Sequence, residues 1–174
     1  VPILVVGSVA LDSVQTPFGE AERVVGGSAV FFSAAASLFG PVRVVGVVGE
    51  DYPLEKLEFL AERGVDLSGI EQAEGESFFW AGRYSHDLNS RDTLETRLGV
   101  FADFRPRVPE GFRDSSCVFL GNIDPVLQLE VLDQVTSPRV VACDTMNYWI
   151  EGNPDALLEL LKKVDILLGN DAEA

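Results

Sequence analysis

The sequence predicts an α/β fold: a three-layer, doubly wound and mostly parallel β-sheet with helices on both faces, plus a small β lid. Short apolar runs rich in β-branched residues alternate along the chain with segments of helical length. The residues that follow these runs are mainly Gly, Asn and Asp. Alternation of this kind is typical of βαβ units, in which neighbouring strands run parallel and a helix crosses between them.

The N-terminal part supplies two predicted strands and two predicted helices. The strands are residues 2–7 and 42–49, short runs of Val, Ile and Leu that read as strands buried on both faces. The alanine-rich segment 28–40 has helical length and ends in a glycine, where a C-cap is expected. The segment 52–64 predicts the second helix through one apolar stripe, formed by Leu54, Leu57, Leu60 and Ala61.

The alternation breaks between residues 65 and 104. No helical period is visible there, and residues 77–85 and 93–101 have the composition of strands. We expect this segment to form a lid, or a dimer-contact sheet, outside the main α/β body. If the segment is a dimer-contact sheet, two copies of the protein would form a homodimer through these predicted strands.

The alternation then resumes with three predicted strands and two predicted helices. The strands are residues 116–121, 139–143 and 165–169. The helices are residues 124–135 and 153–164, and each begins with an Asp or Asn N-cap followed by proline, the favoured start.

The composition excludes several classes of protein. The chain has 174 residues, of which 47% are hydrophobic and 24% charged, so it is a globular chain of one domain. Its net charge of −15 repels a polyanion, and we expect no nucleic-acid partner. His86 is the single histidine, which argues against a His-based zinc site and a Ser-His-Asp triad.

Cysteine usage and hydropathy predict a cytoplasmic protein with no membrane partner. Cys117 and Cys143 each lie in an apolar stretch, as buried reduced thiols do. The N-terminal apolar run is too short for a signal peptide. The most apolar stretch, residues 24–48, is interrupted by glycines, a proline and Arg43, so it does not read as a membrane span.

The ends of the predicted strands are candidate ligand sites, because open parallel sheets bind ligands at their carboxyl edge. Oxygen-bearing side chains there would suit substrate hydroxyls or a hydrated Mg²⁺, although the same residue types also form turns and caps. No P-loop and no dinucleotide-binding glycine pattern follows any strand. The polar strand ends are residues 7–12, 49–51, 121–124, 144–147 and 169–173.

Four stretches, in this order and spacing, together resemble the ribokinase-like (PfkB) carbohydrate kinases. The first, VVGSVALD, leads to an aspartate, and the second is a Gly-Gly turn that enters an alanine-rich helix. The third ends in V-G-x-D, and the fourth, VDILLGNDAEA, is similar to the family's N-x-x-E. They span residues 5–12, 24–40, 42–53 and 164–174.

The resemblance implies a set of substrate-binding residues. Asp12 would accept hydrogen bonds from substrate hydroxyls, and Gly26 and Gly27 would let the backbone approach the sugar closely. Phe31 stands where the family often has an asparagine that reaches the sugar, a departure that leaves open a nucleoside base or a more apolar sugar. We add Asn122, at the end of a predicted strand, to the same set.

The resemblance also implies ATP and Mg²⁺ as cofactors. Asn170 and Glu173 would help to hold the phosphates and, through water, the Mg²⁺ ion. The same pair fits a capping box, with Asn170 as N-cap and Glu173 at N3, and the two roles are compatible. Asp51 either caps the helix that follows it or contacts a ligand.

The family's G-A-G-D motif, which supplies the catalytic base and the anion hole, has no counterpart in this sequence. No residue of this chain is therefore assigned as the catalytic base. We expect the chain to be an incomplete domain, the N-terminal part of an ATP-dependent sugar kinase whose catalytic and ATP-binding part follows. The alternatives are a nucleoside kinase of the same family and a non-catalytic α/β domain that binds a small molecule.

Overall fold

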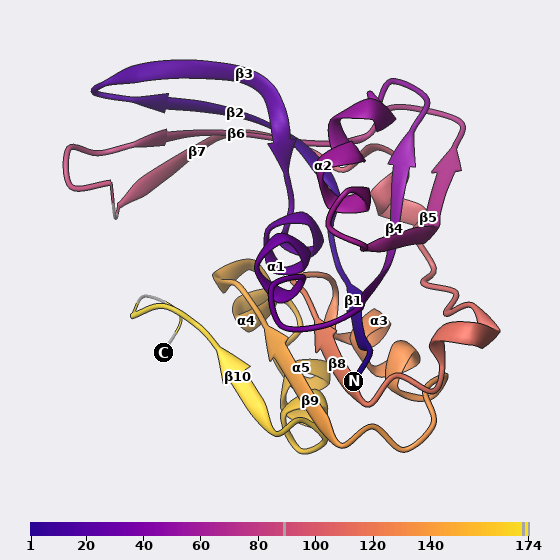
Figure 1. Cartoon of the computed structure of the whole chain (residues 1–174). Helices are drawn as coiled ribbons and strands as arrows, with labels where there is room; N and C mark the ends of the chain where they lie inside the picture. The colour runs from indigo at the N-terminus through magenta and orange to yellow at the C-terminus, as the bar shows by residue number, and fades with distance from the viewer. Residues whose placement is uncertain (89, 172, 174) are drawn as a thin grey trace.

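The computed structural model describes residues 1–88, 90–171 and 173 (Figure 1). Within these residues, a six-stranded sheet forms the body of the molecule in the order β10-β9-β8-β1-β4-β5, and every neighbouring pair is parallel. The predicted parallel sheet is thus confirmed. The strands are β1 (Ile3–Val6), β4 (Val42–Gly49), β5 (Asp66–Ala73), β8 (Cys117–Leu120), β9 (Val140–Asp144) and β10 (Ile166–Leu168).

The strand order reverses at β1. The chain first adds β4 and β5 on one side of β1, and then β8, β9 and β10 on the other. Ligands bind in the crevice beyond the carboxyl ends of the strands at such a reversal. The loops after β1, β8, β9 and β10 are therefore the place to look for a site.

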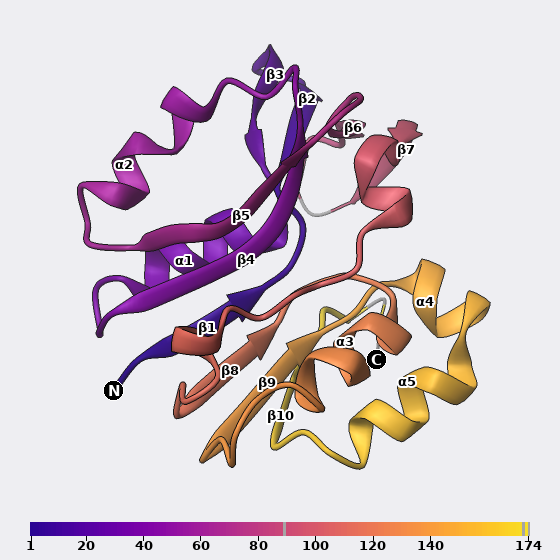
Figure 2. The same cartoon turned by 90° about the vertical axis from the view of Figure 1, so that its right-hand side faces the viewer.

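Helices cover both faces of this sheet, which gives three layers. Figure 2 shows α1 and α2 on one side of the strands and α3, α4 and α5 on the other. No helix in the described part of the chain is long and apolar enough to cross a membrane. The helices are α1 (Ser28–Ala36), α2 (Glu58–Ala61), α3 (Pro125–Leu132), α4 (Asn147–Gly152) and α5 (Pro154–Leu161), with 3₁₀ turns η1 (Leu54–Leu57), η2 (Gly99–Asp103) and η3 (Glu110–Phe112).

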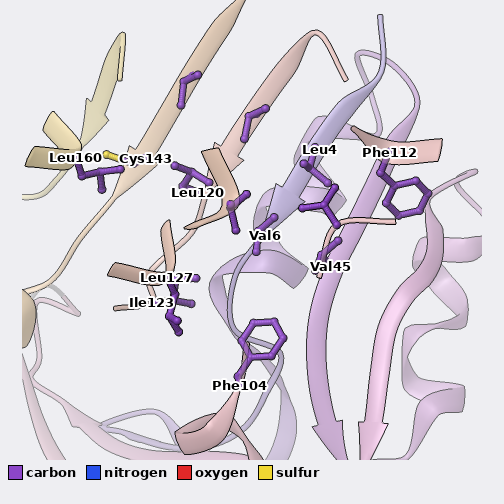
Figure 3. Close-up of a cluster of buried hydrophobic side chains, with 14 of the residues drawn as sticks. Leu4, Val6, Val45, Phe104, Phe112, Leu120, Ile123, Leu127, Cys143 and Leu160 are labelled. Carbon is purple, nitrogen blue, oxygen red and sulfur yellow. The ribbon is translucent and has the colours of Figure 1, made fainter. Parts of the chain in front are cut away.

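Alternate residues of the central strands enter two separate hydrophobic cores. In β1, Leu4 and Val6 belong to the same core cluster as Leu127 of α3 and Leu160 of α5 (Figure 3). Val5 points to the opposite face and packs with Val30 of α1. Burial of both faces explains why these strands are continuous apolar runs and not alternating ones.

A second sheet projects from the body (Figure 1). Its order is β3-β2-β6-β7, with antiparallel pairs β2–β3 and β6–β7 joined by a parallel pair, β2–β6. It is thus two hairpins placed side by side. The strands are β2 (Ala10–Thr16), β3 (Gly19–Gly26), β6 (Phe78–Tyr84) and β7 (Arg91–Arg97).

The predicted boundaries of the lid segment, 65–104, were wrong in two respects. Strand β5 belongs to the main sheet, where it pairs with β4. The β2–β3 hairpin contributes half of the second sheet and was not predicted as a hairpin. Among the described strands of the predicted segment, β6 and β7 lie outside the main sheet, as expected.

Local predictions near the helices also need correction. The helix predicted over 52–64 is a 3₁₀ turn followed by a four-residue α-helix. Asp124 caps α3 as predicted, since its Oδ1 accepts a hydrogen bond from the Val126 amide at 2.9 Å. Asn153, in contrast, makes no capping bond to α5, although Pro154 occupies the first turn.

Candidate functional site

Asp12 and the Gly-Gly turn lie together where β2 meets the end of β3. Asp12 pairs with Val24 across the ladder, and its carboxyl group lies directly against the backbone of Gly26, so that a Cβ at Gly26 would overlap it. Gly27 has φ of +100°, and a Cβ there would overlap the Ser8 carbonyl oxygen. Only glycine fits both positions, because both backbones make close approaches.

Ser8 already occupies the first amides of α1. The Ser28 amide donates to Ser8 Oγ at 3.0 Å, and the Ala29 amide donates to the Ser8 carbonyl at 3.0 Å. These two amides therefore join the helix to the loop after β1 and are not available to a ligand.

Tyr52 is a neighbour of Asp12 that the sequence analysis did not select. Its ring is buried in the core cluster that also contains Leu11, and its Oη has no hydrogen-bond partner among the described residues. Burial raises the pKa of Tyr52, and the charge of Asp12 raises it further. Burial also raises the pKa of Asp12, to about 6. A carboxylate shielded from water in this way forms strong hydrogen bonds with any hydroxyl that reaches it.

Asn122 follows β8, next to Gly121, which packs against Ser28 of α1. Its Oδ1 accepts a hydrogen bond from Trp149 Nε1 of α4 at 2.9 Å. The side chain is thus held at the carboxyl edge of the sheet by a helix that the sequence analysis missed. The amide nitrogen of Asn122 is the part left to contact a ligand.

Asp144 and Thr145 end β9 with polar atoms buried away from water. Asp144 Oδ1 and Thr145 Oγ1 have no hydrogen-bond partner within the part of the chain that the structure describes. Burial raises the pKa of Asp144 to about 7, and the negative charge of Glu173 contributes to the rise. A buried carboxyl group with a second acidic side chain beside it is a typical environment for a cation. No group of three or more His, Cys, Asp and Glu side chains suited to a metal occurs among the described residues.

Asn170 and Glu173 form the two bonds of a capping box. The Glu173 amide donates to Asn170 Oδ1 at 3.1 Å, and the Asn170 amide donates to Glu173 Oε2 at 3.0 Å. This geometry agrees with the capping interpretation of the motif. The helix predicted to begin here would include residues 172 and 174, which lie outside those the structure describes.

A cavity of about 690 Å³ separates the β6–β7 hairpin from this end of the main sheet. The second sheet contributes Tyr84 and Arg91 to its wall. The main body contributes Asn147, Asn170 and Glu173. The cavity therefore brings a cationic side chain opposite the N-x-x-E residues.

Phe31 lies one turn into α1, and its amide bonds to the Gly27 carbonyl. Its side chain is 62% exposed, in contrast to Phe32, which stacks on Phe119 in the core. An exposed aromatic ring one turn from the Gly-Gly pair is a flat apolar surface beside the Asp12 region. The structure thus leaves the ring free for contact with a ligand or with another segment.

The fold is an open parallel α/β sheet with polar groups at its carboxyl edge, and comparison with known proteins finds chains that are similar to it. A curated relative is a cytidine kinase from Thermococcus kodakarensis, 27% identical over 175 residues that cover 99% of this chain and 62% of the relative. The chain thus spans about three fifths of that relative's length. No protein-family model matches the chain.

Solved structures identify the fold. A nucleoside kinase from Methanocaldococcus jannaschii, an archaeal member of the ribokinase family, superposes with a TM-score of 0.73 at 18% identity, over 99% of this chain and 61% of that one. A ribokinase from Cryptococcus neoformans in complex with ADP gives a TM-score of 0.72 at 17% identity, over 99% and 57% of the two chains. The ribokinase-like fold predicted from the sequence is therefore confirmed.

Proposed function

We propose that the full-length protein is an ATP- and Mg²⁺-dependent kinase that transfers the γ-phosphoryl group to a hydroxyl of a carbohydrate. The observation that carries this proposal is the placement of two polar clusters along one carboxyl edge of a ribokinase-like sheet. One contains Asp12 and the Gly-Gly turn, and the other contains Asp144, Asn170 and Glu173. A phosphoryl acceptor and a phosphoryl donor need two such sites side by side.

Asp12 would hold the acceptor hydroxyls. Above about pH 6 its carboxylate is ionised and accepts two charge-assisted hydrogen bonds. Gly26 and Gly27 leave the adjacent backbone without side chains. Asn122 would add an amide donor from the neighbouring strand end.

The second cluster suits a magnesium–phosphate group. Asp144 Oδ1 and Thr145 Oγ1 are buried oxygens that lack a protein partner among the described residues, and oxygen ligands are the kind that Mg²⁺ takes. We propose that Asp144, and Glu173 through water, hold the ion, and that Asn170 orients the phosphates. Bound there, Mg²⁺ would offset the charge of the transferring phosphoryl group.

The second sheet would act as the lid. Its β6–β7 hairpin forms one wall of the cavity whose other wall carries Asn170 and Glu173. Exclusion of water from such a cavity strengthens electrostatic interactions and limits hydrolysis of the donor. A homodimer through the lid strands and a cytoplasmic location remain proposals from the sequence.

A nucleoside is the alternative acceptor, and Phe31 is the observation that favours it. The exposed ring could stack on a base as two aromatic rings do, whereas a free sugar has no aromatic ring to offer. The relative from Thermococcus kodakarensis is a cytidine kinase, so nucleosides belong in any substrate test. A non-catalytic domain that binds a small molecule is the second alternative.

The test is an ADP-release assay with a panel of sugars and nucleosides, applied to the full-length protein and to the 174-residue chain. We expect acceptor-dependent turnover by the full-length protein and none by the chain, because no residue here is placed as the general base or the anion hole. Turnover by the chain alone would contradict that division of roles. Acceptor binding without turnover by the full-length protein would favour the binding domain.

A further inference from the structure

Gln128 is a polar side chain in the middle of a core helix. It lies in α3 between Leu127 and Leu129 and is 1% exposed. Burial of an amide without hydrogen bonds costs a few kcal/mol. The hydrogen bonds of the Gln128 side chain must therefore offset the cost of burying it in the core.

The side-chain amide nitrogen of Gln128 touches three main-chain carbonyl oxygens. Nε2 lies 3.0 Å from the Leu120 oxygen, 2.9 Å from the Gly121 oxygen and 3.2 Å from the Asp144 oxygen. The first two belong to the end of β8, and the third belongs to the end of β9. The β8–β9 ladder stops at the pair Leu120–Cys143. Gln128 thus links the ends of strands β8 and β9 at the point where their pairing stops.

Only a side chain with a hydrogen-bond donor can make this link, because all three partners are acceptors. The link is also costly, since Oε1 of Gln128 has no hydrogen-bond partner in the described residues. A buried unsatisfied acceptor lowers stability by about 1–3 kcal/mol. A leucine would fill this core position without that cost, so the amide supplies a constraint that packing alone would not.

The two strand ends that Gln128 joins carry candidate site residues. Gly121 leads directly to Asn122, and Asp144 carries the buried carboxyl group near Glu173. We propose that Gln128 is a positioning residue that fixes the Asp144 segment against the end of β8, and so sets the geometry of the metal–phosphate site. This inference rests on the proposed function, and Gln128 itself contacts neither substrate nor ion.

The chain offers a matched control in Gln134, two residues beyond the end of α3. Gln134 Nε2 donates to the Pro106 oxygen at 2.9 Å and the Glu130 oxygen at 3.1 Å, and its Oε1 accepts from the Val108 amide at 2.9 Å. It therefore also makes three side-chain to main-chain bonds, but far from the carboxyl ends of β8 and β9. Gln128→Met and Gln134→Met each keep the side-chain length and remove the amide.

The experiment compares these variants in the full-length protein. For Gln128→Met we expect the half-saturating Mg²⁺ concentration in turnover to rise about 10-fold, as for other residues that orient metal ligands, with an unchanged KM for the acceptor. Gln134→Met should lower the melting temperature and leave both constants unchanged. Equal Mg²⁺ dependence in the two variants would show that Gln128 has only a structural role.

A second readout does not require turnover. Mn²⁺ titration in the presence of ATP, followed by electron paramagnetic resonance, should show weaker Mn²⁺ binding in Gln128→Met than in Gln134→Met. If the wild-type protein turns over no acceptor but this difference appears, the proposed kinase function fails and the positioning role stands. If Mn²⁺ binding is the same in both variants, the positioning role fails. Gln128→Asn, which keeps the amide on a shorter side chain, replaces Gln128→Met if that variant does not fold, with the same expected results.

Discussion

Asp12 combines a proposed function with a cost in stability. Its pKa is about 6 in the folded protein, against 3.8 for an ordinary aspartate, because burial disfavours the charged form. Between these two pH values the folded state holds a proton that the unfolded state has lost. Stability therefore falls as the pH rises from about 4 to about 6.

We predict that Asp12→Asn stabilises the full-length protein at pH 8 and weakens substrate binding. Each pKa unit corresponds to about 1.4 kcal/mol, and water around a partly exposed carboxylate reduces the effect, so a gain of about 1 kcal/mol is expected. Thermal unfolding at pH 8 and pH 4 measures it, and the gain should disappear at pH 4. Asp92→Asn, an exposed residue of β7, controls for the change in net charge. Unchanged acceptor affinity by calorimetry would remove Asp12 from the site.

The candidate site residues around Asp12 can be predicted from the sequence more easily than the residues that pack beside them. Asp12, Gly26 and Gly27 belong to a motif that is visible in the sequence. Tyr52 was not selected, because nothing in the sequence indicates that its hydroxyl is buried without a partner among the described residues. A contact between distant segments is set by packing and has no local signal.

At the scale of elements, five of the six strands of the main sheet were predicted, and β5 was not. Strands buried on both faces are apolar throughout, as in VRVVGVVG of β4. The β2–β3 hairpin lacked that signal, since β3 reads GEAERVVG and most of it is exposed. Helix α4, NYWIEG, is too short to show a helical period.

Asp51 joins elements of the two sheets, an interaction that was not predicted from the sequence. It neither caps η1 nor lines the cavity between the β6–β7 hairpin and the main sheet. Its Oδ1 accepts hydrogen bonds from the Ser77 amide and Oγ, both at 2.7 Å, and its Oδ2 forms an ion pair with Arg23 at 2.7 Å. Ser77 precedes β6 and Arg23 lies in β3. One carboxylate after β4 therefore anchors both hairpins of the second sheet to the main sheet.

We predict that Asp51→Ala lowers the free energy of unfolding by about 2 kcal/mol, since bonds to a charged group contribute about 1.5–3 kcal/mol. Burial alone would raise the pKa of Asp51, but the bonds from Ser77 and Arg23 hold it below its ordinary value. The contribution is thus present at neutral pH and is lost as the pH falls through the lowered pKa. Urea unfolding at pH 7 measures it.

The control is Asp114→Ala, which removes an ion pair of the same length to Arg43. The Asp114 side chain is 77% exposed, so its loss should cost less than about 1 kcal/mol. Equal losses in the two variants would mean that Asp51 does not anchor the second sheet.

At the scale of the whole molecule, net charge and an exposed edge strand oppose each other. Strand β10 is an outer strand of the main sheet, and Ile166, Leu167 and Leu168 are each 46–49% exposed. An edge strand offers unpaired backbone groups to another chain. The net charge of −15 resists that approach at long range.

We predict that the 174-residue chain associates through β10 and that salt promotes the association. Raising the ionic strength from about 0.01 M to 0.15 M shortens the Debye length from about 30 Å to about 8 Å, which screens the repulsion but not contacts between apolar side chains. Sedimentation velocity at several salt concentrations should show the average mass rising with salt. Leu167→Lys, which places a charge on the edge, should keep the chain monomeric, whereas Leu158→Lys, at an exposed site on α5, should not. Association that persists in Leu167→Lys would place the contact on another surface, and a mass that falls with salt would indicate attraction between charges instead.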